Sequence, residues 1–206
     1  VIIFSELQKS LLEKLGVPGN KIKVIPNGID TDKFTPGNSE FKKKFNGKQI
    51  YTYLGRINPE KGIDDMLKAF TRSNLENAQL VIVGGGSQEK VLKAIYGEEP
   101  NVTWTGVIKD EDKRIDILRG TDAFILPSQI EGLSLSLLEA MACGAPTVAT
   151  DVGSDGEVLS DGAGIIIDPM KVKSHLGYTL KLLYDHSDFR KLLSLKARER
   201  VVEKYS

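Results

Sequence analysis

The chain has 206 residues, 40% of them hydrophobic, and its 28 basic residues balance its 28 acidic ones. That length supports one hydrophobic core with a short appendage at most. The absence of net charge argues against general attraction to nucleic acid or to an anionic membrane. All apolar runs are strand-sized, so none predicts a transmembrane helix. The single cysteine, Cys143, excludes an internal disulfide and is typical of a reducing compartment, while its small neighbours predict helix packing.

The first residues form an apolar run, Val1-Ile2-Ile3-Phe4, which is typical of a buried strand. Because this run is preceded neither by methionine nor by a signal peptide, we expect the chain to be part of a longer protein. Ser5 is the predicted cap of a helix with leucines along one face, and Gly16 ends it. A strand is predicted over 22–25, followed by a turn and a polar loop over 26–38.

From residue 49 onward, short apolar strands alternate with amphipathic helices. Strands are predicted at 50–54, 80–83, 102–104, 123–126 and 147–150. Helices are predicted at 63–72, 88–96, 112–119 and 133–143, and two more at 172–184 and 188–204. This alternation predicts an α/β fold with a doubly wound parallel sheet, which binds ligands at the carboxyl ends of its strands.

The loop after the first strand of this series carries two cations. Gly55 permits a tight turn, Arg56 offers a planar fork that suits phosphate oxygens, and Lys61 follows just before a predicted helix. We interpret Arg56 and Lys61 as an anion site. The alternative is that both are ordinary surface charges, paired with Glu60 or Asp64.

The next strand leads into Gly84-Gly85-Gly86, where the lack of side chains would let a base or a ribose lie against the backbone. This run is not the GxGxxG fingerprint of dinucleotide-binding proteins, and no acidic residue follows at the required offset. A tight turn between strand and helix is the alternative interpretation.

The segment 131–139 has two carboxylates, Glu131 and Glu139, at the ends of an otherwise apolar helix start that carries hydroxyl groups. On one ideal helix this spacing corresponds to a rise of about 12 Å, too far for the pair to act as acid and base on one glycosidic bond. We therefore expect Glu131 to accept hydroxyls of a hexose and Glu139 those of a ribose, while exposed amides at the helix start hold a phosphate. The alternative for Glu131 is an acid that satisfies the helix dipole, and the alternative for Glu139 is a solvated helix position.

Two Asp-x-Asp pairs have a spacing that can hold a divalent cation on a diphosphate: Asp30 with Asp32, and Asp110 with Asp112. The first pair follows a turn, and the second resembles the acidic start of a helix. We therefore expect no metal site and no cofactor.

Four motifs in this order resemble the nucleotide-binding half of a group 1 (family 4) retaining glycosyltransferase of GT-B fold. They are Pro26-Asn27-Gly28-Ile29-Asp30, Gly55-Arg56 with Pro59-Glu60-Lys61-Gly62, Val83-Gly84-Gly85-Gly86, and Glu131-Gly132 through Glu139-Ala140-Met141-Ala142-Cys143-Gly144. The resemblance covers nearly the whole chain. It implies one half of a two-domain fold, in which a missing N-terminal domain supplies the acceptor site. Residues 1–206 would be the donor domain, with 1–20 leading from the missing domain and 170–206 forming the C-terminal helices.

The resemblance also implies the roles of individual residues. Arg56 and Lys61 would bind the donor diphosphate, Glu139 the ribose, and Glu131 the transferred sugar. The amides of Gly132, Leu133 and Ser134 would assist Glu131, and the base would lie near Gly84, Gly85 and Val107. Two departures leave the donor sugar open: Gly153-Ser154-Asp155 stands where the family often has a Gly-Gly run followed by proline, and Ser134 and Ser136 stand where Gly and Pro are common.

These features predict a hexosyltransferase that transfers a sugar from a nucleoside diphosphate sugar to an acceptor, with retention and without a metal ion. Arg56, Lys61 and the helix start near Gly132 would stabilise the charge on the leaving diphosphate. Alone, the chain is expected to be inactive or weakly active. We expect a cytoplasmic protein without nucleic-acid partners, with membrane contact only through the missing domain. The alternatives are a nucleotide-sugar epimerase of the same fold and a non-catalytic nucleotide-binding module.

Overall fold

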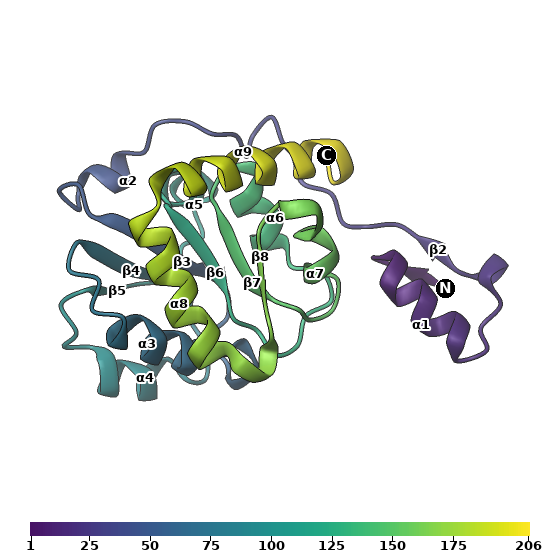
Figure 1. Cartoon of the computed structure of the whole chain (residues 1–206), viewed down its shortest axis with the longest axis horizontal. Helices are drawn as coiled ribbons and strands as arrows, with labels where there is room; N and C mark the ends of the chain where they lie inside the picture. The colour runs from purple at the N-terminus through teal and green to yellow at the C-terminus, as the bar shows by residue number, and fades with distance from the viewer.

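A six-stranded parallel sheet forms the centre of the computed structural model, which describes residues 1–206 (Figure 1). Its strands run in the order β5-β4-β3-β6-β7-β8. They are β3 (Gln49–Leu54), β4 (Ala78–Val83), β5 (Val102–Gly106), β6 (Ala123–Leu126), β7 (Thr147–Thr150) and β8 (Ile165–Ile167). The predicted doubly wound α/β fold is therefore confirmed, and β8 extends the sheet beyond the five predicted strands.

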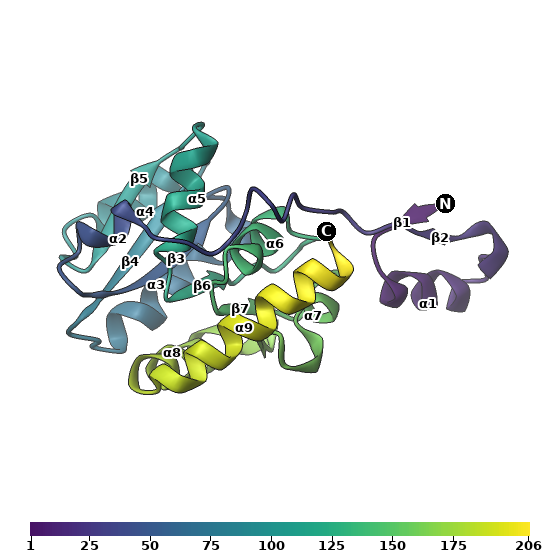
Figure 2. The same ribbon diagram turned by 90° about the horizontal axis from the view of Figure 1, so that it is seen from above.

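Helices cover both faces of this sheet, and α3 and α8 lie side by side on one face (Figures 1 and 2). The helices of the body are α2 (Glu40–Lys43), α3 (Ile63–Arg72), α4 (Glu89–Tyr96), α5 (Glu111–Arg119), α6 (Leu135–Ala142), α7 (Asp155–Val158), α8 (Val172–Asp185) and α9 (Ser187–Lys204). None of them is both long enough and apolar enough to cross a bilayer. The six predicted helices from residue 63 onward are present, with ends that differ by one or two residues.

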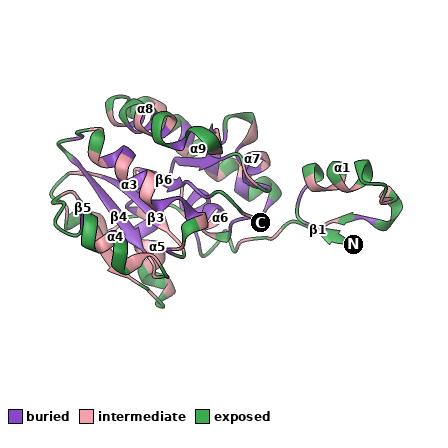
Figure 3. Cartoon of the chain, turned by 90° about the horizontal axis from the view of Figure 1, so that it is seen from below, coloured by how far each residue is buried: buried purple, intermediate pink, exposed green.

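The central strands of the sheet are buried on both faces because they are largely apolar, as is usual in parallel sheets. All six residues of β4 are buried, and in α3 the buried Ile63, Met66, Leu67 and Phe70 recur at helical spacing. These elements belong to one core of 44 buried residues, which Figure 3 shows as the purple interior. Cys143 lies in this core, which confirms its packing role.

Residues 2–24 form a small β-α-β unit that lies apart from the body (Figure 2). It consists of β1 (Ile2–Ile3), α1 (Glu6–Lys14), the short 3₁₀ turn η1 (Gly19–Lys21) and β2 (Lys23–Val24), and β1 and β2 are parallel. Ser5 caps α1 as predicted. The prediction of a buried strand at the N-terminus holds only in part: β1 forms and Ile3 is buried, whereas Val1 and Ile2 are 67% and 68% exposed because no other element covers their side chains.

Side chains and backbone from the body hold this unit and the segment that follows it. Both oxygens of the Glu157 carboxylate accept hydrogen bonds at the start of α1, the shorter from the Leu7 amide at 3.1 Å. The Ile29 amide donates to the Tyr205 carbonyl at the end of α9 at 2.7 Å, and Arg198 donates to the carbonyls of Thr31 and Phe34. The C-terminal helix thus ties the connecting segment to the sheet.

The winding of the sheet reverses between β3 and β6. From β3 the chain adds β4 and β5 on one side, and it then returns to place β6, β7 and β8 on the other side. Loops that follow the two central strands diverge at such a switch point, and they leave a crevice at the carboxyl edge of the sheet. The switch point here lies between the loops after β3 and β6, which contain most of the predicted site residues.

Candidate functional site

An ion pair joins the two loops across the switch point. The ammonium group of Lys61, in the 3₁₀ turn η2 (Pro59–Lys61), lies 2.7 Å from Oε1 of Glu131, and both side chains are largely buried. Ser128 donates a further hydrogen bond of 2.7 Å to the same oxygen. Oε2 of Glu131 accepts no hydrogen bond within the protein, so this second oxygen remains available to a hydroxyl group.

The surface pairings considered for Lys61 do not form. Asp64 pairs instead with Lys68, one helical turn further along α3, and the Glu60 side chain accepts from Asn58. Arg56 is exposed and its guanidinium makes neither a hydrogen bond nor an ion pair, while its carbonyl accepts from the buried Tyr53 hydroxyl at 2.6 Å. The loop is thus fixed through its backbone, and the Arg56 side chain is free to bind an anion.

The start of α6 presents several amides without protein acceptors. Ser134 is the N-cap and its hydroxyl accepts from the Leu137 amide, so the helix begins at Leu135, two residues later than predicted. The amides of Gly132, Leu133, Leu135 and Ser136 donate to no group in the protein. Exposed amides at a helix N-terminus are suited to bind an anion.

The Ser134 amide, which the resemblance assigned to the ligand, is engaged inside the protein. It donates to Oδ1 of Asp155 at 3.0 Å. Asp155 is completely buried, and its Oδ2 has no hydrogen-bond partner. Burial is the main cause that raises the pKa of Asp155 to about 7; the charge of Glu131 acts in the same direction, and the Ser134 amide and Lys61 act against it. Sequence reasoning missed this residue, and the only signal for it was the unusual Gly153-Ser154-Asp155 sequence.

The loop after β7 packs directly behind the loop before α6. Gly153 has a φ of +58°, and a Cβ there would lie 2.2 Å from the Glu131 carbonyl oxygen. The adjacent Ser154 amide donates to the Gly132 carbonyl at 2.8 Å. Only glycine allows so close an approach, so Gly153 and Ser154 hold Glu131 and Gly132 in position from behind.

Glu139 projects from the second turn of α6 and is half-buried. Its carboxylate makes no hydrogen bond, and burial raises its pKa, while the Arg114 guanidinium acts in the opposite direction. The alternative for this residue, a solvated helix position, does not fit, since such a side chain would be exposed. A carboxylate that is partly desolvated without a partner is suited to accept hydroxyl groups.

A hollow of about 270 Å³ lies at the carboxyl ends of β3 and β4. It brings five of the predicted residues together, namely Gly55, Arg56, Gly84, Gly85 and Val107. Gly84 has a φ of +141°, and a Cβ there would lie 1.8 Å from the Gly55 carbonyl oxygen, so its glycine is required by a close approach of two backbones. Arg114 from α5 also lines the hollow, and sequence reasoning did not single it out.

The two Asp-x-Asp pairs have local structural roles. Oδ1 of Asp30 accepts from the amides of Asp32 and Lys33 in a turn, and Asp110 caps α5 by accepting from the Lys113 amide. Their interpretation as a turn and a helix start is therefore confirmed. No three His, Cys, Asp or Glu side chains in the structure are grouped so as to hold a metal ion.

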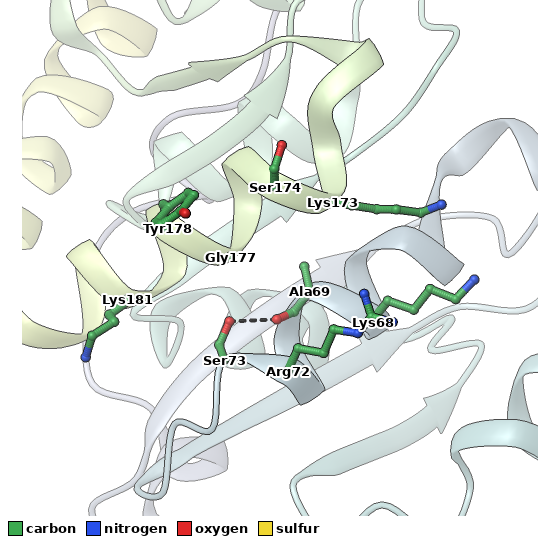
Figure 4. Close-up of a pocket in the computed structure, with 9 residues that line it drawn as sticks. All are labelled: Lys68, Ala69, Arg72, Ser73, Lys173, Ser174, Gly177, Tyr178 and Lys181. Atoms are coloured by element: carbon green, nitrogen blue, oxygen red, sulfur yellow. Dashed lines mark hydrogen bonds between the residues drawn. The ribbon is translucent and has the colours of Figure 1, made fainter.

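A second hollow, of about 440 Å³, lies in the groove between α3 and α8 and contains four cations (Figure 4). Three of them have acidic partners: Lys68 pairs with Asp64, Lys173 with Asp65 and Lys181 with Asp185. Figure 4 shows Lys173 and Lys181 pointing toward opposite ends of the groove. Because these charges are neutralised and diverge, the groove resembles an ordinary charged helix–helix seam.

Comparisons with known proteins agree with this geometry. A mannosyltransferase of Corynebacterium glutamicum, which is GDP-mannose-dependent and acts on a monoacylated phosphatidylinositol monomannoside, is 30% identical over 178 residues, covering 78% of this chain and 46% of that protein. An Escherichia coli α-1,3-galactosyltransferase, described as UDP-Gal:α-D-GlcNAc-diphosphoundecaprenol-specific, is 27% identical over 100% of this chain and 56% of its own length.

The fold is shared with solved structures. The Anabaena protein HepE in complex with UDP superposes with a TM-score of 0.88 at 18% identity, over 100% of this chain and 59% of that one. The chain spans about half the length of the curated relatives it matches. The family model described as "Glycosyl transferases group 1" matches residues 36–200. The sheet is of the GT-B type, and the loops at its switch point bring Lys61 and Glu131 together. Because the family model matches most of its length, the chain belongs to the group 1 glycosyl transferases.

Proposed function

We propose that the chain is the donor-binding domain of a glycosyltransferase that transfers a sugar from a nucleoside diphosphate sugar to an acceptor, with retention and without a metal ion. The observation that carries this proposal is the pair of loops that flank the switch point: one carries the unpaired Arg56, the other leads to the free amides at the start of α6, and the Lys61–Glu131 ion pair joins them. Relatives named for GDP-mannose and UDP-galactose support the donor class.

The leaving diphosphate would lie against Arg56 and the free amides of Gly132 and Leu133. Lys61 is partly neutralised by Glu131, so it contributes local charge and at the same time fixes the Glu131 carboxylate. As the bond between the anomeric carbon and the diphosphate breaks, negative charge grows on the phosphate. Preorganised donors that already point at that position lower the barrier without a metal ion.

The sugar would be held by the free Oε2 of Glu131, whose other oxygen is occupied by Lys61 and Ser128. Glu139 would accept the ribose hydroxyls, because its half-buried carboxylate has no partner in the protein. The Ser134 amide would support the loop through Asp155 and would not contact the ligand directly.

The domain organisation follows from the same proposal. Residues 1–20 would lead from an N-terminal acceptor domain, and residues 170–206 would form the helices that return toward it. The exposed Leu7, Leu11 and Leu15 of the N-terminal unit give that domain an apolar surface to pack against. Without it the acceptor is not placed and the cleft stays wet, so this chain alone would transfer sugar weakly or not at all.

Calorimetric titration of the chain with UDP, GDP and ADP, each with magnesium and with a chelator, tests the proposal. We expect one nucleotide to bind with the same affinity under both metal conditions. Arg56→Ala should weaken binding at least about tenfold, as expected for loss of a charged hydrogen bond, and Glu139→Gln should weaken it as well. Arg72→Ala, on the far end of α3, is the matched control and should leave the affinity unchanged.

The proposal fails if no nucleotide binds, or if Arg56→Ala and Arg72→Ala bind the nucleotide with the same affinity. Retention is tested separately in a longer protein that contains the acceptor domain, by NMR assignment of the anomeric configuration of the product. An inverted product would exclude retention, and recovery of an epimerised nucleotide sugar without transfer would favour the epimerase.

A further inference from the structure

The polar side chains that line the hollow at the ends of β3 and β4 are all hydrogen-bond donors. Seven of its nine lining residues are apolar or glycine, and the two others are Arg56 and Arg114. Arginine only donates hydrogen bonds. The hollow therefore presents side-chain donors and no side-chain acceptor, in a setting that is otherwise lined by apolar residues and glycine.

Arg114 is held in place by its surroundings. Its Nη1 donates to the Lys109 carbonyl at 3.2 Å and lies 3.5 Å from the Ile108 carbonyl, and Nη2 lies 3.6 Å from Oε1 of Glu111. The side chain is only 22% exposed. A guanidinium that is anchored at one nitrogen loses little conformational freedom when its other nitrogens bind a ligand.

The other nitrogens of Arg114 make no hydrogen bond within the protein: Nε has no partner, and Nη2 lies only within ion-pair distance of Glu111. The Arg114 guanidinium also lowers the pKa of Glu139 against the effect of burial, so Arg114 both lines the hollow and acts on the carboxylate proposed to hold the ribose. A base that continues from a ribose at Glu139 into the hollow would pass beside this guanidinium.

We propose that Arg114 determines base specificity by donating to a ring carbonyl, so that the site prefers nucleotides with an oxo group over those with an amino group at the same ring position. Uracil and cytosine differ in this way at position 4, and hypoxanthine and adenine differ at position 6. An exocyclic amine would direct its own donors at a cation and leave the unused donors of Arg114 unpaired, which is costly in a desolvated site. This inference rests on the proposed function.

Calorimetry with two matched pairs of ligands, UDP with CDP and inosine diphosphate with ADP, tests the role of Arg114. We expect the wild-type chain to prefer the oxo member of at least one pair by about tenfold or more. Arg114→Leu, which keeps apolar cover over the hollow, should bring that ratio close to one. Arg114→Lys should retain part of the preference, because it keeps the charge and loses the planar fork.

Arg72→Leu is the matched control and should keep the wild-type ratio, and thermal melting of each variant checks that it is folded. If Arg114→Leu weakens both members of a pair equally, Arg114 acts on the ribose or diphosphate, and base recognition is refuted. An unchanged ratio refutes it as well, while the proposed function stands as long as the nucleotides bind. If the wild-type chain binds none of the four nucleotides, this inference fails, and the proposed function fails with it only if GDP does not bind either.

Discussion

Replacing Asp155 with asparagine removes a buried charge without changing the shape of the side chain. Asp155 is completely buried, and one of its oxygens has no partner, so its ionised form is destabilised in the folded protein. Burial raises its pKa from 3.8 to about 7. At about 1.4 kcal/mol for each pKa unit, ionised Asp155 lowers the stability of the folded state by about 4 kcal/mol.

The sign of the pH dependence follows from proton binding. Between pH 4 and pH 7 the folded chain keeps a proton on Asp155 that the unfolded chain has lost, so the free energy of unfolding falls as the pH rises. The full loss of stability from ionised Asp155 is reached above pH 7, and this loss is absent below pH 4. The stability advantage of Asp155→Asn over the wild type should therefore grow by roughly 2 to 3 kcal/mol from pH 5 to pH 8.

Urea unfolding at pH 5, 6, 7 and 8 measures this difference for the wild type and for Asp155→Asn. Asp112→Asn is the control, because Asp112 is exposed and its carboxylate makes no hydrogen bond, so this variant replaces an acid without removing a buried charge. A difference in the free energy of unfolding between the wild type and Asp155→Asn that stays constant from pH 5 to pH 8 would refute the reasoning. It would show that Asp155 ionises normally.

Three further outcomes are expected from the site. Lys61→Met leaves the Glu131 carboxylate buried without its cation and should lower the free energy of unfolding in urea by about 3 to 5 kcal/mol. The double variant, Lys61→Met with Glu131→Leu, should recover part of this loss. Equal losses in both proteins would show that the pair is not coupled. Gly84→Ala should cost more stability than Gly47→Ala, because both positions have positive φ and only the first would also push a Cβ into a carbonyl oxygen; similar melting temperatures would contradict this. Gly132→Ala should leave the melting temperature nearly unchanged, because its Cβ would contact only the Phe4 ring at 3.9 Å, and should weaken nucleotide binding in calorimetry by crowding the free amides; unaltered affinity would remove Gly132 from the binding site.

The regular part of the fold could be predicted because its signals are local. Strand-sized apolar runs such as 123–126 and 147–150 are bounded by turn residues, and the amphipathic spacing in 63–72 is helical, so the predicted bounds of these elements match the structure. The N-terminal run was misread in part, because burial depends on what packs above a strand. Val1 and Ile2 have the composition of a core strand and yet have no such layer.

The site was predictable only in outline. Topology alone brings the loops after β3 and β6 together, so the positions of Lys61 and Glu131 at one edge follow from the alternation of strands and helices. Their direct pairing, and the orientation of Glu131 by Ser128, depend on loop geometry that spacing does not encode. Asp155 and Arg114 were missed for the same reason, since each reaches the site from an element whose side-chain direction the sequence leaves open.

A crystal structure of the chain with a bound nucleoside diphosphate gives the most direct test of the proposed donor site. The diphosphate is expected against the Arg56 guanidinium and the amides of Gly132 and Leu133, with the ribose at Glu139 and the base beside Gly84. A nucleotide found in the groove between α3 and α8, or anywhere away from the carboxyl edge of β3 and β6, would contradict the assignment of the switch point as the donor site.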